Sequence, residues 1–147
     1  MSKYNNKKVE LDGREFDSEA ESKYYELLKE RQAAGEIQAI EFQPAFVLQP
    51  GFKKNGKRFD AIIYKADFMI YLPNGEVEVI DVKGVETDTF NIKKKMFEYK
   101  FPHLSLVLIG YKTRKKNKQP IYHFMGLDEL KKMRREAKKA RKLKQAK

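Results

Sequence analysis

The sequence predicts an α/β (α+β) fold in which a mixed sheet is flanked by helices. Three observations support this class. Residues 64–84 form two alternating apolar arms around a turn, which predicts a β-hairpin. Residues 18–34 and 89–101 carry apolar side chains at helical spacing, and the apolar run 104–111 is typical of a buried strand. The expected order is therefore helix, three strands, helix and strand.

Length and composition indicate one domain. The chain has 147 residues and no cysteine, which excludes a disulfide scaffold, a cysteine-based zinc site and a thiol nucleophile. No apolar run approaches the roughly 18 residues that a membrane span needs. The N-terminus has no apolar segment of a secretory signal. We expect a cytoplasmic protein without a membrane-spanning part.

Positive charge is concentrated at the C-terminal end. Residues 131–147 hold ten Lys or Arg and one Glu, a net charge of +9, so the other residues contribute only +2 of the total of +11. We therefore expect a body at 1–126, with a flexible stretch at 1–10, and a basic helix or tail at 127–147. Such a tail favours a polyanionic partner, nucleic acid first and an anionic membrane surface second.

The N-terminal half begins with a predicted small hairpin at 9–16, turning at Asp12-Gly13. The first helix, at about 18–34, has Asp17 or Ser18 as its cap and ends at a glycine. A strand at 38–48 is expected to be interrupted at Pro44.

Residues 49–58 are expected to form a basic, glycine-rich loop. The hairpin arms follow at 59–71 and 76–83, and Pro102 stops the second helix, which Thr87 or Asp88 caps. A basic loop at 112–120 and a short edge strand at 121–125 come next. A final helix from Leu127 carries an apolar stripe that fades after Ala140 and consists of Leu127, Leu130, Met133 and Ala137.

Two carboxylates and a lysine lie on the central hairpin. Asp81 and Lys83 are two residues apart and share a face of their strand. A three-residue loop at 73–75 places Asp67 opposite Asp81, whereas a two-residue loop places Asp67 opposite Val82. Directly opposed carboxylates repel each other, and a divalent cation would compensate. An Asp/Lys surface pair is the alternative interpretation.

Four sequence blocks in this order resemble the PD-(D/E)xK nuclease superfamily. Within it, the chain looks similar to an uncharacterised phage and prophage group that resembles Holliday junction resolvases. The resemblance spans roughly residues 10–110 and implies a restriction-endonuclease-like αβββαβ core. Ala66 stands where the proline of the superfamily name would be. The blocks are Phe16-Asp17-Ser18-x-x-Glu21, Gln43 with Phe46 and Leu48, Tyr64-x-x-Asp67-Phe68 and Asp81-Val82-Lys83-Gly84.

The resemblance implies roles for the residues of these blocks. Asp67 and Asp81 would bind one or two Mg²⁺ ions, with Mn²⁺ as a substitute, helped by the Val82 carbonyl. Lys83 would orient the attacking water, and Glu21 would complete the metal shell.

Two of the candidates have alternatives. Glu21 also fits a capping box with Ser18, in which it bonds back to the helix start. Glu19 could serve as the acidic ligand in its place. Gln43 is a further candidate for the active site.

Basic residues of the loops, the second helix and the tail are the expected phosphate contacts. Such contacts give affinity without sequence information. No base-reading motif is present, which favours recognition of DNA shape, in branched or duplex DNA. Symmetric cleavage by a resolvase-like enzyme would imply a homodimer. We expect the protein in the host cytoplasm if it is phage-encoded. The alternative is a non-catalytic nucleic-acid-binding protein. The expected contacts are Lys53, Lys54, Lys57, Arg58, Lys95, Arg114, Lys115, Lys116, Arg134, Arg135, Lys138 and Lys139.

Overall fold

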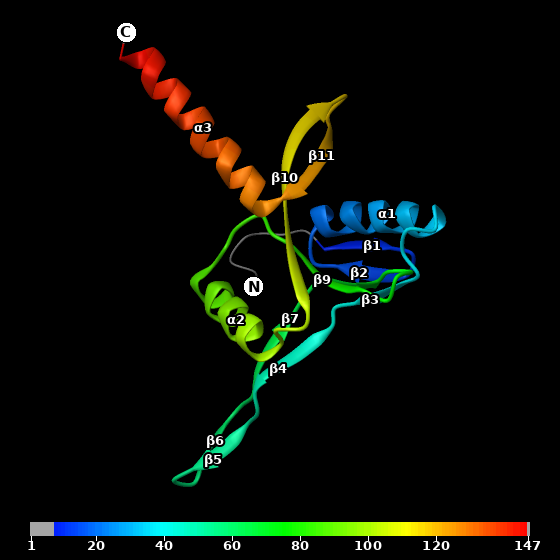
Figure 1. Ribbon diagram of the computed structural model, residues 1–147, viewed down its shortest axis with the longest axis vertical. Helices are drawn as coiled ribbons and strands as arrows, with labels where there is room; N and C mark the ends of the chain where they lie inside the picture. The colour runs from blue at the N-terminus through cyan, green and yellow to red at the C-terminus, as the bar shows by residue number, and fades with distance from the viewer. Residues whose placement is uncertain (1–7, 147) are drawn as a thin grey trace. The chain divides into compact units, whose positions relative to one another are not determined.

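The computed structural model describes residues 8–146 (Figure 1). Within them the chain forms three helices and eleven strands, so the mixed α+β class predicted from the sequence is confirmed. Hydrogen bonding orders five strands as β11-β10-β9-β8-β3. The elements are β1 (Val9–Leu11), β2 (Arg14–Phe16), α1 (Glu19–Ala33), β3 (Ala39–Phe42), β4 (Ala45–Gln49), β5 (Phe52–Lys54), β6 (Lys57–Phe59), β7 (Ile62–Lys65), β8 (Phe68–Tyr71), β9 (Val77–Val82), α2 (Asp88–Lys100), β10 (Ser105–Lys116), β11 (Gln119–Gly126) and α3 (Leu127–Gln145).

The described chain divides into two compact units. The terminal unit comprises residues 8–24, 82–84 and 108–146, and the central unit comprises residues 25–81 and 85–107.

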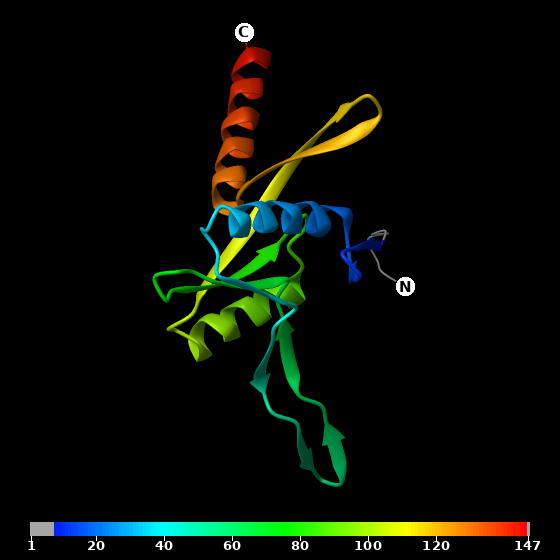
Figure 2. The same cartoon turned by 90° about the vertical axis from the view of Figure 1, so that its right-hand side faces the viewer.

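A long antiparallel ribbon dominates the central unit. β3, β4 and β5 run outward and β6, β7 and β8 return, through the successive ladders β3–β8, β4–β7 and β5–β6 (Figure 2). The ribbon is interrupted at residues 43–44 and 66–67, which confirms the predicted break at Pro44, and again at residues 50–51 and 60–61. The arm expected at 59–71 is thus three strands, because the chain bends where it changes partner.

The prediction of a loop at 49–58 is wrong. Phe52 pairs with Phe59 and Lys54 with Lys57, so these residues form a hairpin. Asn55 and Gly56 have φ of 52° and 75°, the positive values that a two-residue type I′ turn requires. The Asn55-Gly56 dipeptide is the local sequence signal for this turn, but the many lysines around it led to the prediction of a loop.

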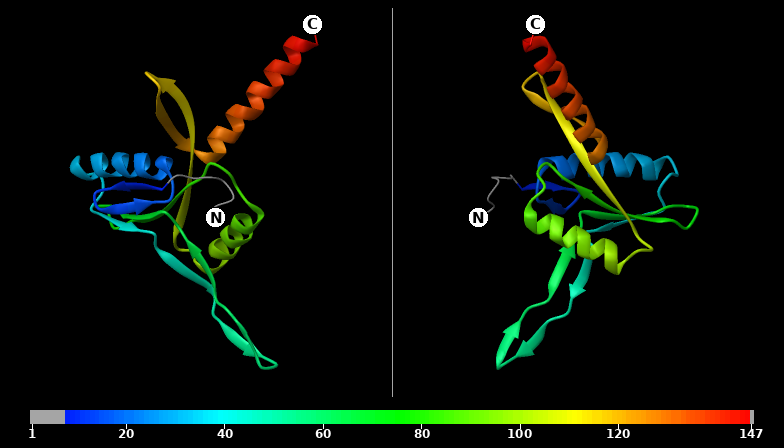
Figure 3. Two further views of the ribbon diagram at one scale, coloured as in Figure 1. Left: turned by 180° about the vertical axis from the view of Figure 1, so that it is seen from behind. Right: turned by 60° about the vertical axis from the view of Figure 1, so that its left-hand side comes forward.

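Helix α2 covers the middle of the ribbon, where it packs against β4 and β7 (Figure 3). Phe97 is fully buried, with its ring 4.9 Å from that of Phe46 and 5.4 Å from that of Tyr64. The helix starts as predicted, since the Thr87 hydroxyl accepts a hydrogen bond of 3.0 Å from the Phe90 N–H. This packing fixes Tyr64 beneath the helix.

Two hairpins belong to the terminal unit. β1 and β2 pair around Asp12-Gly13, as the sequence predicts. The flexible stretch expected at 1–10 lies outside the described residues for 1–7, whereas Val9 and Glu10 belong to β1. The second hairpin, β10–β11, replaces the loop predicted at 112–120 and extends the edge strand predicted at 121–125 to Gln119–Gly126. Asn117 and Lys118 form its turn, at φ of 54° and 65°.

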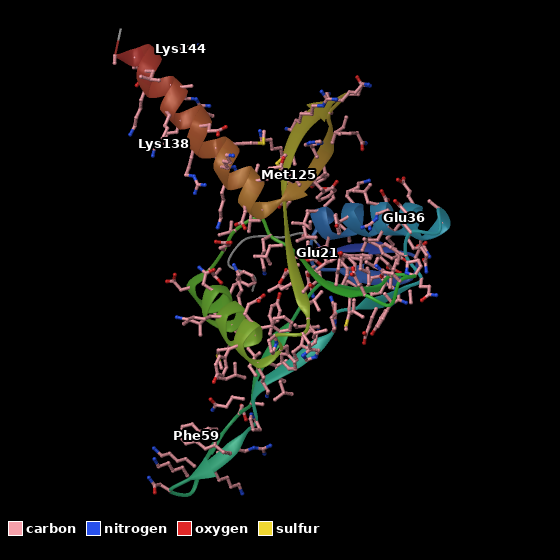
Figure 4. The ribbon with its side chains drawn as sticks, viewed as in Figure 1. Glu21, Glu36, Phe59, Met125, Lys138 and Lys144 are labelled. Atoms are coloured by element: carbon pink, nitrogen blue, oxygen red, sulfur yellow. The ribbon has the colours of Figure 1, made fainter. Side chains whose placement is uncertain are left out.

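Helix α3 is basic and exposed along most of its length. Leu127 and Leu130 are buried, but Met133 is 39% exposed and Ala137 is exposed, so the predicted apolar stripe ends after its second member. The helix continues to Gln145 because Ala, Lys, Arg and Leu are strong helix formers. Figure 4 shows Lys138 and Lys144 projecting from it. None of the helices in the described part of the chain is long and apolar enough to cross a membrane.

Candidate functional site

The β8–β9 hairpin has the register that the odd-length turn predicts. Its ladder ends with Phe68 paired with Ile80, and the Leu72 N–H donates to the Glu76 carbonyl at 2.9 Å. One residue further on, Asp67 leaves the regular ladder. Its N–H donates to the Ile80 carbonyl at 3.1 Å, so the direct pairing of Asp67 with Asp81 is replaced by an irregular step.

Asp67 is held between two neighbouring strands through its own backbone. Its carbonyl accepts a hydrogen bond of 2.9 Å from the Gln43 N–H, while its N–H bonds to Ile80. Gln43 lies at the break between β3 and β4. Its φ is 46°, in the left-handed region that costs a residue with a side chain about 1–2 kcal/mol. Strained backbone conformations of this kind are often found at functional sites. Here the strained residue, Gln43, lies next to Asp67, to which its backbone is hydrogen-bonded.

Asp81 is a buried carboxylate with a tyrosine partner. It is 2% exposed, and the Tyr64 hydroxyl donates to its Oδ2 atom at 2.5 Å. Tyr64 comes from β7 and is itself 3% exposed. The bond fixes the orientation of the carboxylate, because both partners are packed in the interior of the unit.

The charges of both aspartates reach the Tyr64 hydroxyl. Burial raises the pKa of Tyr64 above its ordinary value, and the negative charges of Asp81, Asp67 and Glu98 raise it further. The phenol therefore remains a neutral donor. The charges of Asp67 and Asp81, the two carboxylates that the sequence singles out, therefore both act on the Tyr64 hydroxyl within the central unit.

Sequence reasoning missed Tyr64 as a site residue. Its only signal was its position in the Tyr64-x-x-Asp67 block. The pairing with Asp81 joins residues seventeen positions apart, and only the packing of β7 against α2 reveals it.

The other predicted site residues belong to the terminal unit. Lys83 follows β9 directly, and its N–H donates to the Ile109 carbonyl at 2.8 Å. Gly84 comes next, where a Cβ atom would lie 2.6 Å from the Tyr111 hydroxyl. The glycine therefore admits the tyrosine ring beside the end of β9, close in the chain to Val82 and Lys83.

Glu21 lies in the first turn of α1 and is half-buried. The Ser18 hydroxyl accepts a hydrogen bond of 3.2 Å from the Glu21 N–H, which is one half of the capping box that the sequence suggests. The cap uses the backbone of Glu21, so it does not decide between the two roles of the carboxylate. Glu19, the alternative ligand, raises the pKa of Tyr122 together with burial, which is the larger cause.

Mg²⁺ prefers oxygen ligands. Across residues 8–146, no group of three or more His, Cys, Asp or Glu side chains gathers closely enough to hold a metal ion. Mg²⁺ is commonly bound by one or two carboxylates together with waters and substrate phosphates. Asp67 and Asp81 fit this sparse donor set.

The predicted DNA contacts lie on four exposed elements. Lys53, Lys54, Lys57 and Arg58 lie on the β5–β6 hairpin, and Arg114, Lys115 and Lys116 lie on the strand β10. Lys95 is exposed on α2. The remaining four, Arg134, Arg135, Lys138 and Lys139, are exposed on α3. Strands therefore display the charges that were expected on loops, whereas α2 and α3 display the charges that were expected on the second helix and on the basic C-terminal helix or tail.

These features define a mixed α+β protein with a buried hydrogen bond between Tyr64 of β7 and Asp81 of β9 and with basic hairpins. A model of one protein family, described as "Protein of unknown function (DUF1064)", matches residues 1–118. The chain belongs to this family. No curated protein and no solved structure matches the chain significantly.

Proposed function

We propose that this protein is a Mg²⁺-dependent endonuclease that hydrolyses phosphodiester bonds in DNA. In this proposal its strands and helices form a restriction-endonuclease-like core. The resemblance of four ordered sequence blocks to PD-(D/E)xK nucleases supports the assignment. The preferred substrate is branched DNA, and symmetric cleavage of a four-way junction implies a homodimer.

The observation that supports the proposal is the buried Tyr64–Asp81 hydrogen bond, together with the influence of the Asp67 charge on the same tyrosine. Two negative charges in a partly buried site repel each other, so each disfavours the ionised form of the other. A bound divalent cation would relieve this repulsion. Tyr64 holds the Asp81 carboxylate in one orientation. Preorganised ligands of this kind are what a metal-dependent hydrolase requires.

Four residues would hold the metal in this proposal. Asp67 and Asp81 would supply carboxylates, and the sequence resemblance implies the Val82 carbonyl and the Glu21 carboxylate as further ligands. When bound, Mg²⁺ polarises the phosphate and lowers the pKa of a coordinated water. Lys83 would orient the water that attacks phosphorus. The bond from the water oxygen to phosphorus would form as the bond from phosphorus to the leaving oxygen breaks. The attacking water would release a proton to solvent, and the leaving oxygen would take up a proton from solvent.

Metal-dependent cleavage of four-way, flap and linear duplex DNA tests the proposal. Wild-type protein is expected to cleave in Mg²⁺ and to stop in EDTA. Asp81→Asn, Asp67→Asn and Lys83→Ala should each lose at least about a hundredfold in rate, the scale of a lost electrostatic or acid–base group. Asp12→Asn is the matched control, because Asp12 is exposed in the β1–β2 turn. Cleavage unchanged by all three site variants would refute the assignment.

The charged hairpins favour a second candidate, a nucleic-acid-binding protein without catalysis. In that case the Tyr64–Asp81 pair is a structural hydrogen bond of the core. Tight binding without cleavage in Mg²⁺ or Mn²⁺ would support this candidate over the nuclease.

A further inference from the structure

The tip of the long ribbon carries an exposed aromatic pair. Phe52 and Phe59 face each other across the β5–β6 hairpin, with ring centroids 4.8 Å apart and planes 11° from parallel. They are 44% and 45% exposed. Figures 2 and 4 show this hairpin as the end of the ribbon, with Phe59 labelled on it in Figure 4. The pair thus adds nothing to the core around α2, and part of each ring meets solvent.

The same hairpin opposes like charges at both of its remaining cross-strand positions. Lys53 pairs with Arg58 and Lys54 pairs with Lys57. Directly opposed like charges destabilise a sheet by up to about 1 kcal/mol for each pair. Residues 52–59 contain four cations and no acid. The exposed Asp60 lies 4.0 Å from Arg58, and such surface contacts contribute little. A polyanion would relieve this repulsion.

The alternation of the strands sorts these side chains by face. Residues two apart share a face, so the Phe52–Phe59 pair lies on the same side as Lys54 and Lys57. Lys53 and Arg58 lie on the other side. The two aromatic rings and the ammonium groups of Lys54 and Lys57 therefore lie on one face of the hairpin, two residues apart along each strand.

A hollow borders the pair. Its volume is about 410 Å³, and Gly51, Phe52, Lys53, Arg58, Phe59 and Asp60 contribute to its lining. This volume falls in the range of roughly 300–1,000 Å³ typical of small-molecule sites. It accommodates a group of the size of a nucleobase.

We propose that the β5–β6 tip is a stacking platform for unpaired nucleotides. A base stacks against the Phe52–Phe59 pair, and Lys54 and Lys57 contact the adjoining phosphates. Stacking needs a base that has left its duplex, so the tip would distinguish single-stranded or branched DNA from continuous duplex. The inference rests on nucleic acid as the partner in the proposed function, and it does not depend on cleavage.

A second copy of this chain is the competing occupant of the aromatic pair. Pairing two such tips would bring eight cations together, twice the four of residues 52–59, without neutralising any of them. Charge therefore favours the polyanionic partner. Self-association through the tip remains a distinct outcome that the experiment below detects.

Binding in EDTA to oligonucleotides that carry 2-aminopurine tests the proposal without catalysis. The ligands are a single strand, a gapped duplex and a continuous duplex. Phe52→Ile/Phe59→Ile keeps an apolar, strand-forming pair but removes the aromatic faces. Phe52→Tyr/Phe59→Tyr keeps both. Tyr99→Ala is the matched control, because Tyr99 is 90% exposed on α2 of the same unit. Equal rates of trypsin cleavage at Lys53–Arg58 verify that the hairpin remains folded.

The isoleucine variant is expected to lose about 5- to 150-fold in affinity for the single strand and the gapped duplex, the effect of removing one base–aromatic stack. Its affinity for continuous duplex should be unchanged, and quenching of 2-aminopurine should disappear. The tyrosine variant and Tyr99→Ala should behave as wild type.

Three results would overturn the proposal. One is unchanged single-strand affinity in the isoleucine variant with an intact hairpin. Another is loss of a dimer by that variant in sedimentation, without any effect on DNA binding. Failure to bind any nucleic acid would remove the partner itself. In contrast, binding with the expected losses but no cleavage in Mg²⁺ would refute only the nuclease proposal and leave the platform standing.

Discussion

The Tyr64 hydroxyl donates a hydrogen bond of 2.5 Å to Oδ2 of Asp81, and both side chains are almost fully buried. Tyr64→Phe removes this donor from the carboxylate without changing the packed ring. We expect a loss of about 1–3 kcal/mol in the free energy of unfolding, measured by urea denaturation. Tyr99→Phe, at an exposed position, should have no effect. An unchanged stability of Tyr64→Phe would mean that the bond contributes nothing to the fold.

Burial of Tyr64 and the nearby charge of Asp81 predict a loss of stability in alkali. Because the pKa of Tyr64 is raised in the folded protein above its ordinary value of 10.0, the unfolded chain releases this proton first. The stabilisation is complete below pH 10.0 and declines as the pH rises above it. Tyr71, through its hydrogen bond to Glu41, and Tyr122, through burial, also have raised pKa values and act in the same direction.

Comparison of wild type with Tyr64→Phe isolates the contribution of Tyr64. The wild-type melting temperature should fall more steeply in the alkaline range than that of the variant. Parallel curves for the two proteins would contradict the assignment.

Substitution of the strained Gln43 distinguishes a role in stability from a role in catalysis. Gln43→Gly relieves the penalty of φ 46°, and we expect the free energy of unfolding to rise by no more than about 1 kcal/mol, because glycine loses more backbone entropy on folding. If the Gln43 side chain acts in catalysis, cleavage should fall while the protein becomes more stable. Asn55→Gly, at φ 52° in the hairpin turn, is the matched control for stability. A destabilised Gln43→Gly would show that the side chain supports the fold.

Gly84 and Tyr111 form a pair that a double-mutant cycle can test. A Cβ atom at Gly84 would lie 2.6 Å from the Tyr111 hydroxyl, so Gly84→Ala should cost about 1–3 kcal/mol. Tyr111→Phe removes the hydroxyl and should restore part of that stability in the double variant. Calorimetric melting of the four proteins measures the coupling. Additive effects would mean that the ring moves aside freely.

The basic surface of α3 predicts a salt-dependent contribution to DNA affinity. Replacing Arg134, Arg135, Lys138 and Lys139 with Gln should reduce the slope of log affinity against log salt by about 0.9 for each duplex phosphate that these side chains neutralise. The melting temperature should hardly change, because all four side chains are exposed. Titrations at several salt concentrations provide the measurement. An unchanged slope would exclude α3 from the DNA-binding surface.

Local chemistry was enough to predict several elements. The residues at 73–75 set the register of the β8–β9 hairpin, Thr87 caps α2 and Asp12-Gly13 turns the first hairpin. Each depends on a few neighbouring residues, so the sequence determines it directly. Asp67 and Asp81 were singled out in the same way, from strand parity and turn length.

Tertiary structure decided the rest. Tyr64 meets Asp81 only because α2 packs on β7, and Gln43 reaches Asp67 only because β3 and β8 pair. The β5–β6 and β10–β11 hairpins lie in lysine-rich stretches that were predicted to be loops. That prediction was wrong because the density of charge does not determine whether strands pair. Strand pairing and side-chain burial depend on partners that are distant in the sequence. The residues next to a position in the sequence do not identify those partners.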